Sequence, residues 1–496
     1  MKKNIYLFYV ANNPLWRYFP NSILALANPL LKAGFNPVLI DTALEGYKKI
    51  RLDDPLFVGL STYTDENIAV ALRVARDIRK EYPRLPIAWG GPHVIMMPEQ
   101  TARHPLVDHA CYGEGEISVV ELAKSIAEGK DSFHDVPGII WKDRSGKCIK
   151  NPPAPQVNMD ELDVYPYHLL NEKTYKLKNG KIYYEASRGC PYGCKFCAYD
   201  HTKWRKRSPD KVIDDLAYIE ERFSPEEIQI IDSNHFMDPA WAKKIWEGKI
   251  ARNLKFRWEA NIRFDILSKI DDDTLDVLAR SNCYQLRLGA ESGSQKVLDY
   301  LNKGITVEQI TRGLERAVSH KIDPIVSFMM GYPAEADKEM NATADLVDLI
   351  RERFPSAQVN AIYQFQPFPN TKIFEEISKE YHIPQPESLD GWADYNIAKM
   401  RRSVFPWLSA SQYRKTNVLN SILSYMWCSF KIRNMPDSQR KTILLFRFDP
   451  LWKAFLACDL FIRRTFVYLR WKRKVMFAPI EWYIWNFIRE KIVRIY

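Results

Sequence analysis

The sequence predicts an α/β protein in which a doubly wound sheet is followed by a partial barrel and then by a helical region. Short β-type runs alternate with helical stretches along most of the chain, which is the order expected when crossover helices join parallel strands. After residue 403 this alternation gives way to aromatic and basic residues. We expect domains at residues 1–150, 181–390 and 391–496, with residues 151–180 as a linker.

The first 150 residues contain five strand patterns and three helix patterns. Strands are expected at residues 5–10, 37–41, 56–61, 87–90 and 108–111, and helices at residues 21–33, 65–80 and 116–127, the first capped by Asn21. A doubly wound, Rossmann-like sheet binds ligands beyond the carboxyl ends of its strands. The residues at the last three strand ends are Ser61 and Thr62, then Gly90, Gly91 and His93, then Gly113 and Glu114. Glycines there let the backbone approach a ligand closely.

A proline-rich segment at residues 151–155 breaks any helix and marks the linker. Six βα units then follow, which predicts a partial (β/α)6 barrel whose site lies at the carboxyl ends of its strands. The expected strands are residues 181–186, 228–232, 256–260, 285–290, 324–330 and 361–365, and residues 209–223 are expected to be helical.

Three cysteines, Cys190, Cys194 and Cys197, stand in CxxxCxxC spacing after the first of these strands. Their odd number and crowding are against a disulfide framework. A structural zinc site would need a fourth ligand, and the nearest histidine, His201, lies in a segment rich in Lys and Arg. An electron-transfer cluster would also use four thiolates, whereas a [4Fe–4S] cluster held by three leaves one iron open for chemistry.

The run EASRGCPYGCKFCAYD at residues 185–200 resembles the cluster loop of the radical S-adenosylmethionine (SAM) enzymes, with Phe196 just before the third cysteine. The resemblance implies that the open iron binds SAM and that an electron from the cluster cleaves it into methionine and a 5′-deoxyadenosyl radical. It implies SAM contacts at Tyr199, Asp232, Arg263, Glu291, Ser292, Gly331 and Gln366.

Within that implied set the resemblance also suggests roles. Glu291 and Ser292 would contact the ribose or the methionyl amine, and Arg263 would pair the carboxylate, as a guanidinium fork can. The backbone at Gly331 and Tyr199 would border adenine.

The strand-end loops of the first domain resemble the cobalamin-binding domain found ahead of one large class of radical SAM enzymes. The contacts this implies are Asn12, Ser61, Thr62, Gly90, Gly91, His93, Gly113 and Glu114. Cobalamin domains that supply an axial ligand carry DxHxxG after the first strand, but residues 11–16 here read ANNPLW. We therefore expect no axial histidine and take His93 as a tail contact or a turn residue. A free lower face should favour transfer of a methyl radical.

The tail carries the positive charge of the chain. The net charge is +10, and residues 401–496 contain 19 Lys and Arg against 5 Asp and Glu. An amphipathic helix is expected there, with an apolar stripe at Leu451, Phe455, Cys458, Ile462, Phe466 and Leu469. It could lie at a membrane interface or cap the substrate pocket. No stretch reaches the roughly 18 apolar residues of a membrane span, and nucleic-acid binding is not expected.

Together with the apolar and basic tail, the two resemblances imply a cobalamin-dependent, class B-like radical SAM methyltransferase that acts at an unactivated carbon of an apolar or membrane-associated substrate, through a 5′-deoxyadenosyl radical and methylcobalamin. Its cofactors would be a [4Fe–4S] cluster, SAM and cobalamin, with a flavodoxin or ferredoxin as electron donor. The lack of a signal pattern and the small number of cysteines favour the cytoplasm, with a peripheral position at the inner membrane face as a further expectation.

Other functions remain open at this point. An oxidative cyclase resembling the anaerobic porphyrin-ester cyclase would share all these motifs, and so would a non-catalytic cobalamin or redox sensor. A methylthiotransferase is disfavoured, because its first domain needs three cysteines and only Cys111 and Cys148 precede Cys190.

Overall fold

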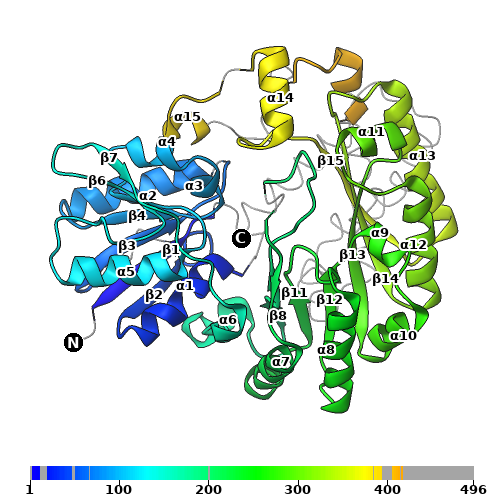
Figure 1. The fold of residues 1–496 in the computed structure, drawn as a ribbon, viewed down its shortest axis with the longest axis horizontal. Coiled ribbons are helices and arrows are strands. Elements are labelled where there is room, and N and C mark those ends of the chain that lie inside the picture. Colours follow the sequence, from blue (N-terminus) through cyan, green and yellow to red (C-terminus); the bar gives the residue numbers. More distant parts are fainter. Residues whose placement is uncertain are drawn as a thin grey trace, which may run out of the picture. The chain divides into compact units, whose positions relative to one another are not determined.

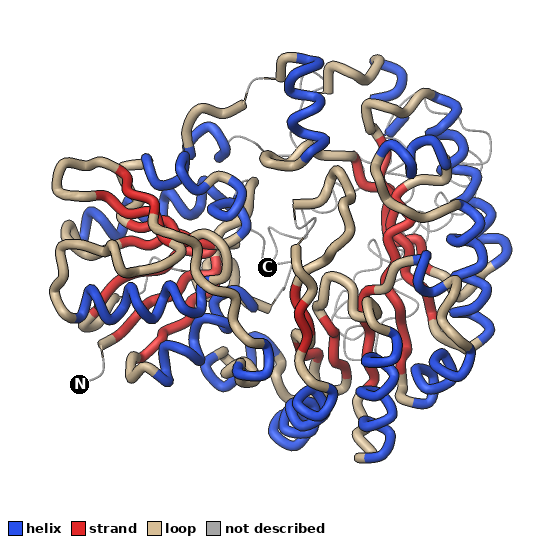
Figure 2. The backbone as a smooth tube through the Cα atoms, in the orientation of Figure 1, coloured by secondary structure: helices blue, strands red, loops and turns tan. Residues whose placement is uncertain are grey.

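The computed structural model describes residues 3–11, 19–46, 51–65, 67–198, 202–383, 385–393, 405–413 and 415–416 (Figures 1 and 2). Contacts divide the chain into two compact units. The first comprises residues 1–260, 280–282 and 367–400, and the second comprises residues 261–279, 283–366 and 401–496. The predicted tail helix and the aromatic residues beyond 416 lie outside the described residues.

A seven-stranded sheet with the order β2-β1-β3-β4-β5-β6-β7 begins the first unit. The strands β1 to β5 are parallel, and β6 and β7 add an antiparallel hairpin at one edge. The strands are β1 (Asn4–Tyr9), β2 (Asn36–Asp41), β3 (Pro55–Ser61), β4 (Ile87–Gly90), β5 (His109–Cys111), β6 (Ile139–Lys142) and β7 (Cys148–Lys150). The helices are α1 (Asn21–Lys32), α2 (Asn67–Glu81), α3 (Pro92–Met96), α4 (Pro98–Arg103) and α5 (Gly115–Ala127).

Helices cover both faces of this sheet because successive side chains of a strand point to opposite sides. Ile5 and Leu7 of β1 pack in a core with α1 and α5. Tyr6 and Phe8 pack in a second core with α2. The arrangement is the doubly wound fold that the alternating pattern predicts, and each predicted strand of this domain matches an observed one within one residue at either end.

Two features differ from the sequence-based expectation. The β6–β7 hairpin was not predicted, because its strands are only four and three residues long. The prediction that Asn21 caps α1 is wrong: Asn21 is the first helical residue, Pro20 occupies the cap position, and no side chain caps the helix.

The rest of the first unit contains three parallel strands in the order β8-β11-β12. They are β8 (Lys181–Tyr184), β11 (Glu227–Ile230) and β12 (Arg257–Asn261). A separate two-stranded antiparallel ribbon is formed by β9 (Ser187–Arg188) and β10 (Arg205–Lys206). The helical segments are η1 (Met159–Glu161), η2 (Tyr167–Leu169), α6 (Glu172–Tyr175), α7 (Pro209–Phe223), α8 (Pro239–Ala251), α14 (Lys372–Tyr381) and α15 (Leu389–Ala393).

The second unit contains three further parallel strands in the order β13-β14-β15. They are β13 (Cys283–Glu291), β14 (Asp323–Met330) and β15 (Gln358–Gln364). Its helices are α9 (Phe264–Leu267), α10 (Asp272–Arg280), α11 (Gln295–Tyr300), α12 (Val307–Ser319) and α13 (Asp337–Arg353). Six parallel strands therefore follow the first sheet. None of the described helices is both long enough and apolar enough to cross a bilayer.

Candidate functional site

The three cysteines lie in the loop that the β9–β10 ribbon closes. Within this loop the backbone N–H of Cys197 donates to the carbonyl of Cys194 at 3.0 Å, and that of Thr202 donates to the carbonyl of Cys190 at 3.0 Å. The Cys194 side chain is buried, and those of Cys190 and Cys197 are half-buried. Gly189 begins the loop with φ +89°, and a Cβ there would come within 2.2 Å of the Lys203 carbonyl oxygen. Glycine is therefore required where the loop leaves β9.

A buried carboxylate holds the strand end that leads into this loop. Asp232 accepts from the backbone N–H of Ala186 at 2.8 Å and from the N–H and hydroxyl of Ser187 at 3.0 and 2.8 Å. His235 Nδ1 lies 2.8 Å from Asp232 Oδ2, and His235 Nε2 lies 3.2 Å from Trp246 Nε1. Because the indole N–H can only donate, Nε2 accepts and Nδ1 donates to Asp232. Asp232, predicted as a SAM contact, thus supports the backbone beside the cluster loop.

The donor set of this loop suits an iron–sulfur cluster. Among the residues that the structure describes, no three His, Cys, Asp or Glu side chains, the three cysteines included, are arranged to bind a single metal ion. Three thiols spread over one short loop instead match the ligands of a [4Fe–4S] cluster with an open iron.

The loop that follows β4 is tightly packed against the end of β3. Gly91 has φ +91°, and a Cβ there would meet Thr62 N at 2.8 Å and Ser61 Oγ at 2.9 Å. The Thr62 carbonyl accepts from the backbone N–H of His93 at 3.2 Å. Four predicted cobalamin contacts therefore lie close together, namely Ser61, Thr62, Gly91 and His93. A fifth, Gly90, directly precedes Gly91. Glycine is required at position 91, because any Cβ there would collide with the end of β3.

His93, the second residue of α3 directly after this loop, is fully buried. Its Nδ1 lies 2.9 Å from Thr64 Oγ1, its ring packs edge-on against Trp392, and its Nε2 has no hydrogen-bond partner among the described residues. Burial lowers the pKa of His93 to about 4, so the imidazole is neutral near pH 7. His93 is thus a buried, hydrogen-bonded residue in the first turn of α3, and its role as a contact of the cobalamin tail stays a prediction.

The loop that follows β5 has a different character. Gly113 has φ +82°, and a Cβ there would meet open space. Glu114, predicted as a cobalamin contact, forms ion pairs with Arg188 of β9 and Arg205 of β10. This carboxylate therefore reaches the ribbon that closes the cluster loop.

In the second unit, Lys303 connects two of the predicted SAM residues. Its ammonium lies 2.7 Å from Glu291 Oε1, and its carbonyl oxygen lies 2.5 Å from Arg263 Nη2. Arg263 Nε also donates to Asp265 at 2.9 Å. Glu291 ends β13 with φ +63°, an unusual backbone conformation for a non-glycine residue, at a register shift between β13 and β14. Sequence analysis missed Lys303, which only the fold brings to these side chains.

Ser292 follows directly and is fully buried. Its hydroxyl lies 3.1 Å from Thr343 Oγ1 and accepts from the Ser294 N–H at 3.1 Å. A Cβ at Gly293 would come within 2.4 Å of the Ala342 carbonyl oxygen, so this turn packs directly on α13. Ser292 thus has a structural role in fixing the turn after Glu291.

Gly331 lies at the end of β14 with φ +92°. Its N–H donates to Glu335 Oε2 at 2.5 Å, and its carbonyl accepts from the Trp407 indole at 2.8 Å. Burial raises the pKa of Glu335 to about 7. Sequence analysis did not single out Glu335. Gln366 lies half-buried just beyond β15, and two predicted contacts, Asn12 and Tyr199, lie outside the described residues.

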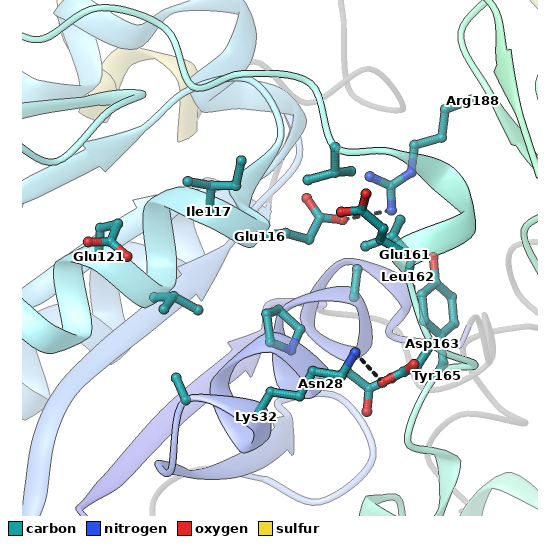
Figure 3. Close-up of a pocket in the computed structure, with 15 residues that line it drawn as sticks. Asn28, Lys32, Glu116, Ile117, Glu121, Glu161, Leu162, Asp163, Tyr165 and Arg188 are labelled. Atoms are coloured by element: carbon teal, nitrogen blue, oxygen red, sulfur yellow. Dashed lines mark ion pairs between the residues drawn. The ribbon is translucent and has the colours of Figure 1, made fainter.

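A cavity of about 420 Å3 lies in the first unit between α1, α5 and residues 157–165 (Figure 3). Lys32 pairs with Asp163 at 2.8 Å and Arg188 with Glu116 at 2.7 Å along its walls. None of the predicted SAM or cobalamin contacts lines it. The cavity therefore contains no predicted cofactor contact, although Arg188 on its wall belongs to the ribbon that closes the cluster loop.

Comparison with protein families gives two matches in tandem. A B12 binding domain matches residues 15–123, and the Radical SAM superfamily matches residues 184–347. The chain belongs to the cobalamin-binding radical SAM enzymes. Its cofactors are a [4Fe–4S] cluster, SAM and cobalamin, and the family assignment, fold class and cofactors expected from the sequence are confirmed. As a radical SAM enzyme it requires a reductant and a small-molecule substrate.

Individual relatives of this radical SAM enzyme are distant. An uncharacterized methyltransferase of Pyrococcus horikoshii is 28% identical over 66% of this chain and 70% of its own. The anaerobic magnesium-protoporphyrin IX monomethyl ester cyclase of Synechocystis is 25% identical over 64% of this chain and 66% of its own. The solved structure of the cobalamin-dependent SAM radical enzyme OxsB, with aqua-cobalamin and SAM bound, matches with a TM-score of 0.71 at 17% identity, over 99% of this chain and 75% of its own. This structural likeness shows a shared fold.

Proposed function

We propose that this enzyme is a methyltransferase that methylates an unactivated carbon. The observation that carries the proposal is the combination, in one compact unit, of a three-cysteine loop and a cobalamin-binding sheet whose first loop, residues 11–16, contains no histidine. When bound, the cluster and SAM supply a 5′-deoxyadenosyl radical, and cobalamin carries the methyl group.

The protein's own contribution is binding and orientation, as is general for enzymes with reactive cofactors. Cys190, Cys194 and Cys197 would hold the cluster, and Asp232 would fix the strand end beside them. Glu291 and Arg263, joined by Lys303, would bind the polar groups of SAM. The strand-end loops at Ser61, Thr62, Gly90 and Gly91 would hold cobalamin.

The names of the relatives specify two different reactions. The name of the Pyrococcus relative specifies methyl transfer, whereas that of the Synechocystis relative specifies ring closure. The absence of a histidine from residues 11–16 favours methyl transfer here, and the cyclase reaction is the second candidate.

Methyl-labelled SAM separates the two without knowledge of the substrate. Anaerobically reconstituted protein is incubated with reductant, cobalamin and deuteromethyl SAM, and the cobalamin is extracted for mass spectrometry. The methyltransferase proposal expects the label on cobalamin. Release of 5′-deoxyadenosine with unlabelled cobalamin would instead support the cyclase, and the absence of that nucleoside would support a sensor.

We further infer that the substrate is apolar or membrane-borne. The support is the sequence of the tail, where 19 basic residues accompany large aliphatic and aromatic side chains. Each cation near an anionic membrane contributes about 1 kcal/mol. Neutralising Lys472, Arg473 and Lys474 to Gln together should therefore weaken binding of the full chain to phosphatidylserine vesicles by about 100-fold. Unchanged cosedimentation would favour a role for the tail in capping the pocket.

A further inference from the structure

The base of the cluster loop carries an unfavourable pair of like charges. Arg188 of β9 stands directly opposite Arg205 of β10 in the antiparallel ribbon. Like charges at directly opposed positions destabilise a strand pair. Both guanidinium groups are largely buried, with 13% and 15% of their side chains exposed. The ribbon therefore needs anions from elsewhere in the fold.

The loop that follows β5 supplies them. Glu114 Oε1 pairs with Arg205, and Glu114 Oε2 lies 3.5 Å from Arg188 Nη1. Glu116, in the first turn of α5, places Oε1 2.7 Å from Arg188 Nη2. One carboxylate thus bridges both arginines, and a second binds the other edge of one guanidinium (Figure 3 shows Arg188 and Glu116).

The Nε edge of the Arg188 guanidinium faces Glu185, which lies three residues earlier in the chain. Its Nε donates to Glu185 Oε2 at 2.8 Å, and the Tyr165 hydroxyl donates to the same oxygen at 2.9 Å. Burial raises the pKa of Glu185, while Arg188 opposes this effect. Arg188 therefore binds three carboxylates from two segments of the chain, which fixes the orientation of its planar fork.

We propose that Glu114 is a positioning residue that couples the cobalamin loop to the cluster loop, so that cobalamin binding and cluster assembly strengthen each other. Gly113 and Glu114 belong to the strand-end loop predicted to contact cobalamin, and the two arginines flank the loop that holds the three cysteines. Any ligand that orders Glu114 also orders the ribbon, and linkage makes the effect reciprocal. The inference rests on the proposed cofactor placement.

The test compares cobalamin affinity in two states of the full chain. Dissociation constants for hydroxocobalamin are measured by absorbance titration on anaerobic protein with the cluster reconstituted and on cluster-free protein. For the natural protein we expect about tenfold tighter binding when the cluster is present, within the usual range for coupled sites. In Glu114→Gln the ratio of the two dissociation constants should fall to about one, because the charge that bridges the two arginines is lost.

A matched control and a spectroscopic readout separate coupling from general structure. Asp131→Asn removes an exposed ion pair with Arg144 in the same unit and should keep the natural ratio. Cobalamin should alter the electron paramagnetic resonance spectrum of the reduced cluster in the natural protein and in Asp131→Asn but not in Glu114→Gln. If Glu114→Gln does not fold, Arg205→Lys, which keeps the charge but loses the fork, should lower the ratio instead.

The outcomes are distinguishable. If Glu114 only contacts cobalamin directly, Glu114→Gln weakens both states equally and the ratio persists, which overturns the coupling. A ratio of one in the natural protein also overturns it while leaving the proposed function intact. Protein that binds no cobalamin in either state overturns both.

Discussion

Two buried carboxylates, each shortly after a parallel strand, are held in opposite ways. Asp232 follows β11, and both of its oxygens accept hydrogen bonds, from the backbone of Ala186 and Ser187, the Ser187 hydroxyl and His235. Glu335 follows β14, and its Oε2 accepts from the N–H groups of Gly331 and Tyr332, while its Oε1 has no hydrogen-bond partner among the described residues. A fully bonded carboxylate organises the backbone, whereas a half-bonded one binds a proton readily.

The largest effect is expected at Asp232. Asp232→Asn keeps the volume but replaces an accepting oxygen by an NH2 group that faces donors, at a cost of about 3 kcal/mol in unfolding free energy. The strand end beside the cluster loop should loosen, and the iron content after reconstitution should fall to less than half. Chemical denaturation and iron analysis measure the two. Asp131→Asn, an exposed carboxylate in the same unit, should change stability by less than about 0.5 kcal/mol; equal effects of both variants would refute the role given to Asp232.

A pH-dependent effect is expected at Glu335. Burial, with a smaller contribution from Glu339, raises the pKa of Glu335 from 4.5 to about 7. The stabilisation from the raised pKa is fully present below pH 4.5 and is lost as pH rises through 7. The glutamine side chain of Glu335→Gln cannot ionise. From pH 5 to pH 8 the unfolding free energy of this variant should therefore rise by up to about 3 kcal/mol relative to that of the natural protein. Denaturation curves at both pH values measure this difference. The same change of unfolding free energy with pH in both proteins would contradict it.

A smaller effect is expected at Glu291. Because glutamine can still accept from Lys303, Glu291→Gln should cost only about 1 to 2 kcal/mol of stability. Affinity of the cluster-loaded protein for SAM, measured by calorimetry, should fall about tenfold, the equivalent of one hydrogen bond. Iron content should stay unchanged, unlike that of Asp232→Asn. Loss of iron without loss of SAM affinity would mean that Glu291, too, is a scaffold residue.

The sequence predicted the strands well because apolar runs bounded by polar strand ends are local patterns. It also located the cluster loop, since three cysteines with this spacing carry their chemistry in the sequence itself. What it could not predict were contacts made by the fold. Glu114 and Arg188 belong to separate domains in the sequence, and Lys303 reaches Glu291 only through the turn after α11. Their pairing depends on tertiary packing.

The central claim is that three thiolates hold a [4Fe–4S] cluster with an iron open to SAM. Electron paramagnetic resonance of the reduced, anaerobically reconstituted protein, recorded with and without SAM, tests it most directly. We predict about four irons per chain and a cluster signal whose g-values change when SAM is added, both lost in Cys194→Ala. A protein without iron, or a Cys194→Ala variant with the same SAM-sensitive signal, would contradict the assignment.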